Sequence, residues 1–363
     1  MINMIKTIFP KMRKLDYGEV FHKAPHHAFL ICCFVFHYIY LHLLKFYATN
    51  ILKRNNFIII SFVEHFGDIV AAEPISRYVK SQYSNSYLVW VVRNRYLELT
   101  KHNPYIDKSL VVCCLTESFI LEKSKVFDVF LNLHFSDRIC LKCDKKLPRL
   151  SGDARITFKN YYNKGNLLTC FCRAAGLSPI SEGPKVYIPQ SCREKIDQFH
   201  LPTEFIVIHC KSNEAVRDWT LDGWNSLILK IKEHHDIKVV EVGTASNGTS
   251  VDIDLCGRLS ILETAEVIRR SVLFVGIDSG PAHLANASSI PGVILIGEFF
   301  GFKNYMPYSG RYAEGRDVDL VYEDGPTKHI SVERVYECVD RRLSFHAMKP
   351  GASFFEKRAV EFE

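Results

Sequence analysis

The sequence predicts an α/β protein built from two doubly wound parallel domains that face a common cleft. Apolar, β-rich segments alternate with helix-like segments in two runs, residues 57–133 and 205–297. Such alternation is typical of parallel sheets, because each helix returns the chain to the same edge of the sheet. At 363 residues the chain is also too long for one typical hydrophobic core and long enough for two.

The composition indicates a folded chain and excludes several protein classes. Hydrophobic residues make up 47% and aromatic residues 12%, which is too much for a disordered chain. The formal net charge of +6 is too small to indicate nucleic acid binding. The twelve cysteines are scattered and we find no secretory signal, so we expect reduced thiols in a cytoplasmic protein.

Shifts in pattern divide the chain into five segments. We expect a basic and apolar N-terminal extension at residues 1–55, a first Rossmann-like domain at 56–185, a linker at 186–203, a second Rossmann-like domain at 204–330, and a C-terminal helix and tail at 331–363. The C-terminal helix, Val332–Phe345, could pack back across the first domain.

An apolar run in the extension, Ala28–Leu44, predicts a helix. It lies at the lower limit of the length that crosses a bilayer. Basic residues precede it, so a span would place everything downstream outside the cell; they are Lys6, Lys11, Arg13, Lys14 and Lys23. Because aromatic and His side chains suit a membrane interface, we expect a helix lying on the inner face of the cytoplasmic membrane. A helix packed on the protein surface is the alternative.

The first domain begins with a buried strand and a glycine loop. The strand Phe57–Phe62 leads through Gly67 to Asp68, which we place at the N-cap of a helix that starts near Ile69. Pro74 should kink or shift that helix. Further strands are expected at Tyr87–Val92, Ser109–Cys113 and Val126–Leu133. After them, a basic stretch, Arg138–Lys164, precedes a helix that ends at Gly176.

The second domain repeats this pattern. Strands are expected at Phe205–His209, Lys238–Val242, Val272–Ile277 and Val293–Gly297. Thr220 should cap a helix over residues 221–233, and Ser260 opens a capping box before a helix over 261–270.

The sequence Asp278–His283, DSGPAH, joins the third of these strands to a short helix. Pro281 suits the first position of a helix. The free amides of a helix start, next to the carboxyl end of a parallel strand, form a favourable place for a phosphate. Asp278, Ser279, the Gly280 amide and His283 would then meet the ligand. The alternative is an ordinary strand-to-helix turn with Asp278 as a cap.

Two patterns raise the question of a metal. Cys140 and Cys143 have the spacing of a zinc knuckle, whereas Cys170 and Cys172 are one residue too close. We favour buried or idle thiols for all four. Two acidic triplets, Asp252–Asp254 and Asp317–Asp319, resemble metal-binding signatures. The first lies in a short strand or turn and the second in a turn-rich region, so we expect both to be solvated.

Taken together, three motifs in order resemble glycosyltransferase family nine, the heptosyltransferases of bacterial lipopolysaccharide core assembly. They are Phe66–Val70 (FGDIV) followed by Pro74, Ser212 with Arg217-Asp218-Trp219, and Asp278–Ala285 (DSGPAHLA) before Pro291. Asn103–Asp107 is similar to a further family segment. The resemblance covers about Phe57–Phe345. It implies a GT-B fold, a nucleotide-sugar donor in the second domain, an acceptor in the first, and inverting transfer without a metal or other cofactor.

The resemblance also implies roles for single residues. Asp68 is the candidate catalytic base, with a plain N-cap as the alternative. The candidate donor and phosphate ligands are Ser212, Asn213, Arg217, Thr244, Asp278, Ser279, Gly280 and His283. Arg217 replaces a Lys that is more frequent in the family, and Thr220 replaces a Pro. No acidic residue closely follows Val242–Thr244 to bind the ribose of the donor.

The expected function is therefore transfer of a sugar, heptose from ADP-heptose in the first instance, to an anionic glycan or glycolipid such as the lipopolysaccharide core. Two alternatives share the fold and the phosphate site. A nucleotide-sugar epimerase would act on the donor alone, and a catalytically silent binding protein would hold the donor without releasing nucleotide.

Overall fold

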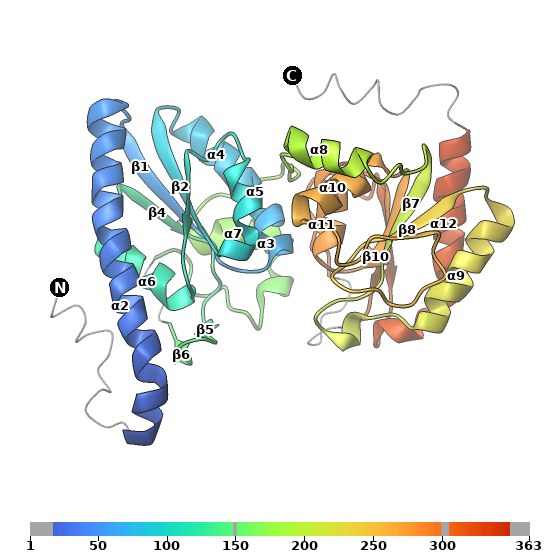
Figure 1. Cartoon of the computed structure of the whole chain (residues 1–363), viewed down its shortest axis with the longest axis horizontal. Helices are drawn as coiled ribbons and strands as arrows, with labels where there is room; N and C mark the ends of the chain where they lie inside the picture. Colours follow the sequence, from blue (N-terminus) through green and yellow to red (C-terminus); the bar gives the residue numbers. More distant parts are fainter. Residues whose placement is uncertain (1–16, 148–150, 299–304, 349–363) are drawn as a thin grey trace.

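The computed structural model describes residues 17–147, 151–298 and 305–348, and side chains from residue 28 onward. The basic residues Lys6, Lys11, Arg13 and Lys14 and the tail beyond residue 348 lie outside the described residues. Figure 1 shows two α/β units side by side, which confirms the predicted fold class.

The first unit is built on a four-stranded parallel sheet with strand order β3-β2-β1-β4. Its strands are β1 (Asn56–Ser61), β2 (Ser86–Val92), β3 (Lys108–Val111) and β4 (Val129–Asn132). Alternate side chains of β1 enter two cores, because Ile58 and Ile60 face one side of the sheet and Phe57 and Ile59 the other. The first side is covered by α3 (Phe66–Ala72), α4 (Pro74–Gln82), α5 (Leu97–Lys101) and α7 (Leu167–Ala175).

The second side of this sheet is covered by α2 (Tyr17–Phe46) and α6 (Leu115–Ser124). Leu30, Phe34 and Leu41 of α2 are buried against the sheet. Two polar contacts also fix α2, since His37 Nδ1 lies 2.5 Å from Glu117 Oε1 and Lys45 Nζ lies 2.6 Å from Asp128 Oδ1. The inner face of α2 is therefore packed on the protein, which was the alternative that the sequence left open.

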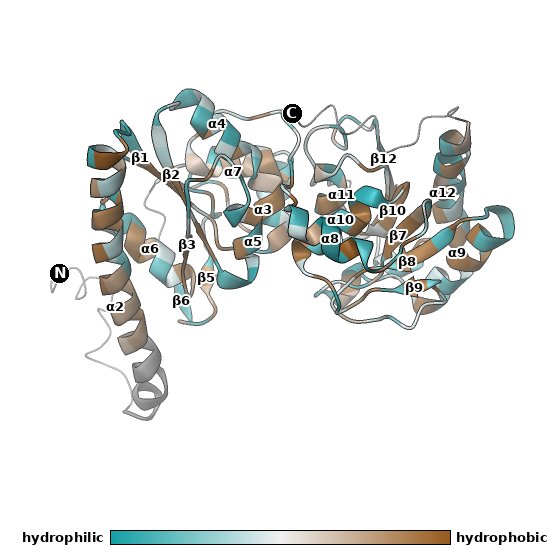
Figure 2. Ribbon diagram, turned by 45° about the horizontal axis from the view of Figure 1, so that its top comes forward, coloured by the Kyte–Doolittle hydropathy of each residue, from teal (hydrophilic) through white to brown (hydrophobic). Residues whose placement is uncertain are grey.

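The outer face of α2 is apolar and exposed. Figure 2 shows brown, hydrophobic residues along this helix. The large hydrophobic residues of α2 that are exposed by more than half are Phe29, Phe36, Ile39, Leu43 and Phe46. Within the described residues, the segment Ala28–Ile51 is the one helix long and apolar enough to cross a membrane. It consists of the end of α2 and a π-helical turn, η2 (Tyr47–Ile51).

The second unit contains a six-stranded parallel sheet with strand order β12-β11-β10-β7-β8-β9. The strands are β7 (Phe205–His209), β8 (Lys238–Glu241), β9 (Ile253–Asp254), β10 (Leu273–Ile277), β11 (Gly292–Ile296) and β12 (Val318–Tyr322). One face is covered by α10 (Ile261–Arg270), α11 (Gly280–Ala287) and α8 (Gln190–Asp197), and the other by α9 (Leu221–His234) and α12 (Val332–Ala347).

Two expectations for this unit are wrong. Residues 317–319 are not a solvated turn, because Val318 and Asp319 begin strand β12, which pairs with β11. The C-terminal helix does not cross the first unit. Val335, Val339 and Leu343 of α12 are buried with Trp224 of α9, since the apolar stripe of α12 matches this face of the second sheet.

The predicted helix caps are confirmed in the second unit, where Thr220 and Ser260 accept hydrogen bonds from Gly223 N and Glu263 N. The cap predicted at Asp68 is wrong. Helix α3 begins at Phe66 with His65 as its N-cap, so Asp68 lies inside the first turn. As expected, Pro74 interrupts the helix, because α3 ends at Ala72 and α4 starts at Pro74.

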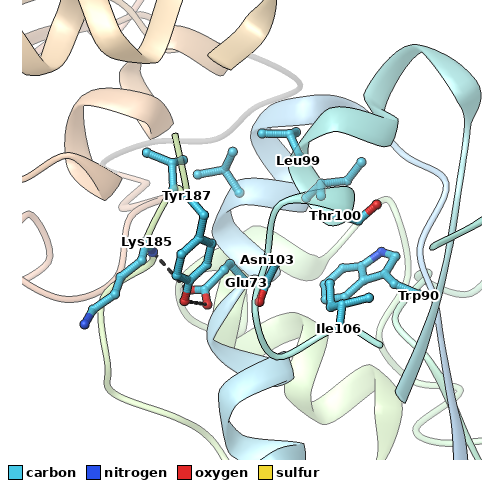
Figure 3. Close-up of a pocket in the computed structure, with 11 residues that line it drawn as sticks. Glu73, Trp90, Leu99, Thr100, Asn103, Ile106, Lys185 and Tyr187 are labelled. Atoms are coloured by element: carbon cyan, nitrogen blue, oxygen red, sulfur yellow. Dashed lines mark hydrogen bonds between the residues drawn. The ribbon is translucent and has the colours of Figure 1, made fainter. Parts of the chain in front are cut away.

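The chain between the units is tied to the end of α3. Figure 3 shows Glu73 receiving hydrogen bonds from Lys185 N and the Tyr187 hydroxyl, each 2.9 Å long. The cavity next to this contact, between Trp90 and Tyr187, has a volume of about 10 Å³. That is room for at most one water molecule, so this cavity is a small packing defect and not a ligand pocket.

The remaining described elements are short. They are the hairpin strands β5 (Ile139–Cys140) and β6 (Lys145–Lys146), and the 3₁₀ turns η3 (Asn94–Tyr96), η4 (Tyr161–Asn163), η5 (Ala215–Arg217) and η6 (Thr327–His329).

Candidate functional site

The amino-terminal ends of α3 and α11 meet where the two units face each other (Figure 1). A Cβ atom on Gly67 would lie 3.1 Å from Gly280 Cα and 3.0 Å from His283 Cδ2. A Cβ atom on Gly280 would lie 2.0 Å from Cζ of Phe66. The glycines in the FGD and DSGPAH motifs are therefore needed for close approach of two helix starts, one from each unit.

Asp68 lies at this junction with an unusual acidity. Burial, and next the negative charge of Glu64, raise the pKa of Asp68 to about 7, although Arg138 and Arg217 act in the opposite direction. The pKa of Asp68 therefore lies well above 3.8, the ordinary value for an aspartate side chain. At neutral pH the carboxyl group is divided between its protonated and ionised forms, as suits a group that exchanges a proton.

Glu64 and Arg138 form an ion pair beside Asp68. Arg138 Nε donates to Glu64 Oε1 at 2.8 Å, and a second guanidinium nitrogen contacts Glu64 Oε2. Burial opposes ionisation of Glu64, but the charge of Arg138 outweighs it and lowers the pKa of Glu64. Glu64 thus stays ionised, and its charge favours the proton on Asp68. Neither residue belongs to a motif recognised in the sequence.

Arg217 reaches the site from the other unit. It ends turn η5, and its guanidinium lies 3.3 Å from the backbone oxygen of Asp278 and 3.8 Å from Asp278 Oδ2. The buried ring of Trp219 fixes this loop by donating from Nε1 to Ile330 O at 2.9 Å. Arg217 therefore lies next to the DSGPAH loop, with 27% of its side chain exposed.

His283 and Asp278 both lie at the start of α11, but their side chains make different contacts. His283 is buried, and burial lowers its pKa to about 4, so its imidazole is neutral at physiological pH. Its ring centroid lies 4.9 Å from that of Tyr308. The Tyr308 hydroxyl donates to Asp278 Oδ1 at 3.0 Å. Ser279 is the N-cap of α11, and its hydroxyl donates to Ile277 O at 3.2 Å.

The remaining predicted donor ligands lie on neighbouring loops. Because β7 is next to β10 in the sheet, the loop after β7 that holds Ser212 and Asn213 is next to the DSGPAH loop. Ser212 is held by Asp218, to which its hydroxyl donates at 3.0 Å, whereas Asn213 is exposed. Thr244 is exposed after the end of β8.

Sequence reasoning missed acidic groups near Thr244. Glu241 ends β8 and Asp254 ends β9, and their carboxylate oxygens lie within 4.8 Å of each other and of Cys256 Sγ. Burial raises the pKa of Glu241. The two acids are thirteen positions apart in the sequence, and only the pairing of β8 with β9 brings them together.

A hollow of about 390 Å³ lies in the first unit within the basic stretch and the helix that follows it. Its lining includes Arg155, Lys164 and Arg173 and one acidic residue, Asp153. Tyr161 belongs to the same segment. It lies close enough to Asp68 that the Asp68 charge, after burial, raises the pKa of Tyr161. The lining of the hollow therefore carries an excess of positive charge.

Comparison with known proteins agrees with this architecture. Residues 184–299 match the family described as Glycosyltransferase family 9 (heptosyltransferase). The lipopolysaccharide core heptosyltransferase OpsX of Haemophilus influenzae is 21% identical over 295 residues, which cover 72% of this chain and 83% of OpsX. The resemblance stated from the motifs is confirmed.

Two solved structures share the fold. A glycosyl transferase family 9 protein from Veillonella parvula aligns with a TM-score of 0.63 and 16% identity, covering 80% of this chain and 98% of that protein. The ADP-heptose lipopolysaccharide heptosyltransferase II of E. coli aligns with a TM-score of 0.60 and 14% identity, covering 80% and 99% of the two chains. The GT-B-type arrangement is thereby confirmed.

Proposed function

We propose that this chain is a glycosyltransferase that transfers heptose from ADP-heptose to a lipopolysaccharide core acceptor with inversion, and the match of residues 184–299 to glycosyltransferase family 9 supports this proposal. The observation that carries this proposal is the position of Asp68 on one unit opposite Arg217 and the start of α11 on the other.

Asp68 is the proposed catalytic base. The acceptor hydroxyl attacks the anomeric carbon, its proton passes to the Asp68 carboxylate, and the bond from the anomeric carbon to the diphosphate breaks. A base with a pKa of about 7 accepts this proton effectively at neutral pH. Glu64 is paired with Arg138 and is therefore not the proposed base. Its negative charge instead helps to raise the pKa of Asp68.

Arg217 and the start of α11 are the proposed trap for the leaving diphosphate. Arg217 supplies a full positive charge, and the helix start supplies free amides and the positive end of the helix dipole. His283 is neutral, so it contributes a hydrogen bond and not a charge. Ser212 and Asn213 would complete the phosphate contacts from the adjoining loop.

Glu241, Asp254 and Thr244 mark the proposed place of the donor's nucleoside. Carboxylates at the carboxyl ends of Rossmann-like strands are suited to bind ribose hydroxyls. Asp254 is exposed, and Thr244 is exposed on the preceding loop. Asp254 is therefore the proposed acidic residue that binds the ribose hydroxyls, which the sequence alone did not reveal.

We further propose that the transfer needs neither a metal nor an organic cofactor. The charge of the leaving group would be met by Arg217 and backbone amides. One carboxylate of each acidic triplet is engaged elsewhere, since Asp252 Oδ2 accepts from Val239 N at 2.9 Å and Asp319 Oδ1 accepts from Arg341 at 2.6 Å. Activity that disappears with a chelator and returns with manganese would contradict this part of the proposal.

The acceptor is proposed to be anionic and membrane-anchored. The hollow lined by Arg155, Lys164 and Arg173 offers positive charge in the same chain segment as Tyr161. The exposed apolar face of α2 could lie in the membrane interface while its inner face stays packed on the sheet. These features favour a peripheral enzyme on the inner face of the cytoplasmic membrane.

A nucleotide-release assay tests the proposed function. The full chain is incubated with ADP-heptose, alone and with lipopolysaccharide core acceptors, and ADP and sugar products are measured. We expect ADP only when an acceptor hydroxyl is present, together with a glycosylated acceptor. An altered sugar formed without acceptor would indicate an epimerase. Donor binding without ADP release by any acceptor would indicate a silent binding protein.

A further inference from the structure

A cluster of three buried cysteines lies in the first unit, outside the site described above. Cys140 and Cys143 come from the β5–β6 hairpin, and Cys114 is the N-cap of α6. Their relative exposures are 3%, 8% and 1%. Their three Sγ atoms all lie within 4.8 Å of one another. The partners considered from the sequence, Cys170 and Cys172, instead lie in α7 and in the other core of the unit.

The hairpin has the geometry of a metal-binding knuckle. Cys143 N donates to Cys140 O at 3.1 Å, and Cys140 pairs with Lys145 across the two short strands. Asp144 directly follows the second cysteine with a φ of 47°, the left-handed conformation that turns the chain back. This tight turn directs both thiols of the Cys140-Leu-Lys-Cys143 segment to one side.

The sulfur spacing fits a tetrahedral zinc ion. A Zn–S bond of about 2.3 Å in a tetrahedron places two sulfurs about 3.8 Å apart. Cys114 Sγ lies 3.8 Å from Cys143 Sγ, which is far longer than a disulfide bond. We propose that Cys114, Cys140 and Cys143 supply three thiolate ligands to one zinc ion.

A helix start and a lysine lie at this cluster. Cys114 begins a helix of ten residues, where the helix dipole favours a thiolate. Lys145 interacts with Cys143, and a lysine there balances the net negative charge of three thiolates on one zinc ion.

The zinc ion would fix the hairpin that carries Arg138. Arg138 precedes Cys140 by two residues, and its backbone oxygen accepts a hydrogen bond from Leu147 N at 3.2 Å, which extends the hairpin. Its guanidinium pairs with Glu64. The metal therefore acts on the reaction only through position, by holding Arg138 beside Glu64.

The test is metal analysis of the full chain, purified under reducing conditions. Elemental mass spectrometry should find one zinc ion per chain. Replacement of zinc by Co²⁺ should give the near-ultraviolet charge-transfer bands of thiolate ligands and the visible bands of tetrahedral cobalt. The double variant Cys140→Ala/Cys143→Ala should lose both signals, whereas the matched control Cys170→Ala/Cys172→Ala should keep them.

A second measurement covers the case in which the double variant does not fold. A mercurial thiol reagent added to the unmodified protein should release zinc in step with the modification of three thiols. The proposal is overturned by a folded protein that carries no zinc and shows no cobalt–thiolate bands, by iron in place of zinc, or by a disulfide between Cys114 and Cys143. The metal content is independent of the proposed transferase activity, so either proposal can fail alone.

Discussion

Phe66 of α3 covers Gly280 of α11 so closely that a Cβ atom at position 280 would lie 2.0 Å from the Phe66 ring. This contact joins the two units at the first turn of each helix. It also explains why both motifs carry glycine at their centres. A side chain at either glycine would separate Asp68 from the start of α11, the proposed phosphate site.

The first prediction tests this contact. Gly280→Ala should displace the Phe66 ring and lower the free energy of unfolding by about 1–3 kcal/mol, the usual cost of overpacking. Thermal or urea unfolding measures it. Adding Phe66→Ala should remove the clash, so Gly280→Ala should cost much less in that background. Equal costs in both backgrounds would show that the ring does not lie over Gly280.

The second prediction concerns catalysis by Asp68. Asp68→Asn should lower kcat by about 10²-fold or more with little change in donor affinity, because general-base catalysis contributes about 10²–10⁴-fold. Single-turnover kinetics and calorimetry with ADP measure the two quantities. Near-normal turnover of the variant would rule out Asp68 as the base.

The same variant should not lose stability. Folding raises the pKa of Asp68 from 3.8 to about 7, so between these pH values the folded chain holds a proton that the unfolded chain releases. Stability from this group is therefore present at low pH and is lost as pH rises towards 7. Asp68→Asn should melt at the wild-type temperature near pH 4 and above it at pH 8. A lower melting temperature at pH 8 would contradict the raised pKa.

The third prediction concerns the pH dependence of the reaction. Because the base must be ionised, kcat/KM should fall as pH decreases through about 7. Glu64→Gln removes a negative charge that favours the proton on Asp68, so it should move this fall to lower pH. A pH profile that is identical in Glu64→Gln would show that Glu64 does not influence the base.

The fourth prediction concerns the diphosphate trap. Arg217→Ala should weaken binding of ADP-heptose and ADP alike, by about 1.5–3 kcal/mol, because a charge-assisted contact exists in both complexes. Isothermal calorimetry with ADP measures the loss. Arg155→Ala, a change of the same type in the hollow of the first unit, should leave ADP affinity unchanged. Equal effects of the two substitutions would place the loss outside the trap.

The fifth prediction concerns the membrane. Removing residues before Asn55 is a poor test, because α2 covers Phe57 and Ile59 and its loss would expose the core. Phe36→Glu/Leu43→Glu, on the exposed face, should instead abolish binding to vesicles with anionic lipid. The control Leu229→Glu, an exposed apolar residue of α9, should bind as the unmodified chain does. High salt should weaken binding, since surface charges are screened.

Vesicle sedimentation can distinguish the three interpretations of the Ala28–Leu44 segment. Release by carbonate would support a helix lying at the interface. Retention after carbonate would indicate a true span, which the packing of Leu30, Phe34 and Leu41 on the sheet opposes. Absence of binding at low salt would leave α2 as a packed helix whose exposed face has another use.

The sequence by itself determined the features that depend on local order along the chain. Alternating apolar segments indicated the two parallel sheets, and Thr220 and Ser260 marked helix starts, because caps and strand burial are written within a few residues. The three motifs in order indicated the family. Pro74 indicated the break after α3, since proline lacks the amide that a continuous helix needs.

Only the tertiary structure decided which distant groups share an environment. The raised pKa of Asp68 could not be predicted, because the sequence does not show that burial and Glu64 act on it together. Cys114 joins Cys140 and Cys143 through the packing of α6 against a hairpin, and Asp254 reaches Glu241 through the pairing of β9 with β8. Helix α12 lies on the second sheet because its apolar stripe matches the face formed with Trp224. The pKa of a side chain, the grouping of thiols and the packing of a helix on a sheet depend on distances through space, which local sequence patterns do not record.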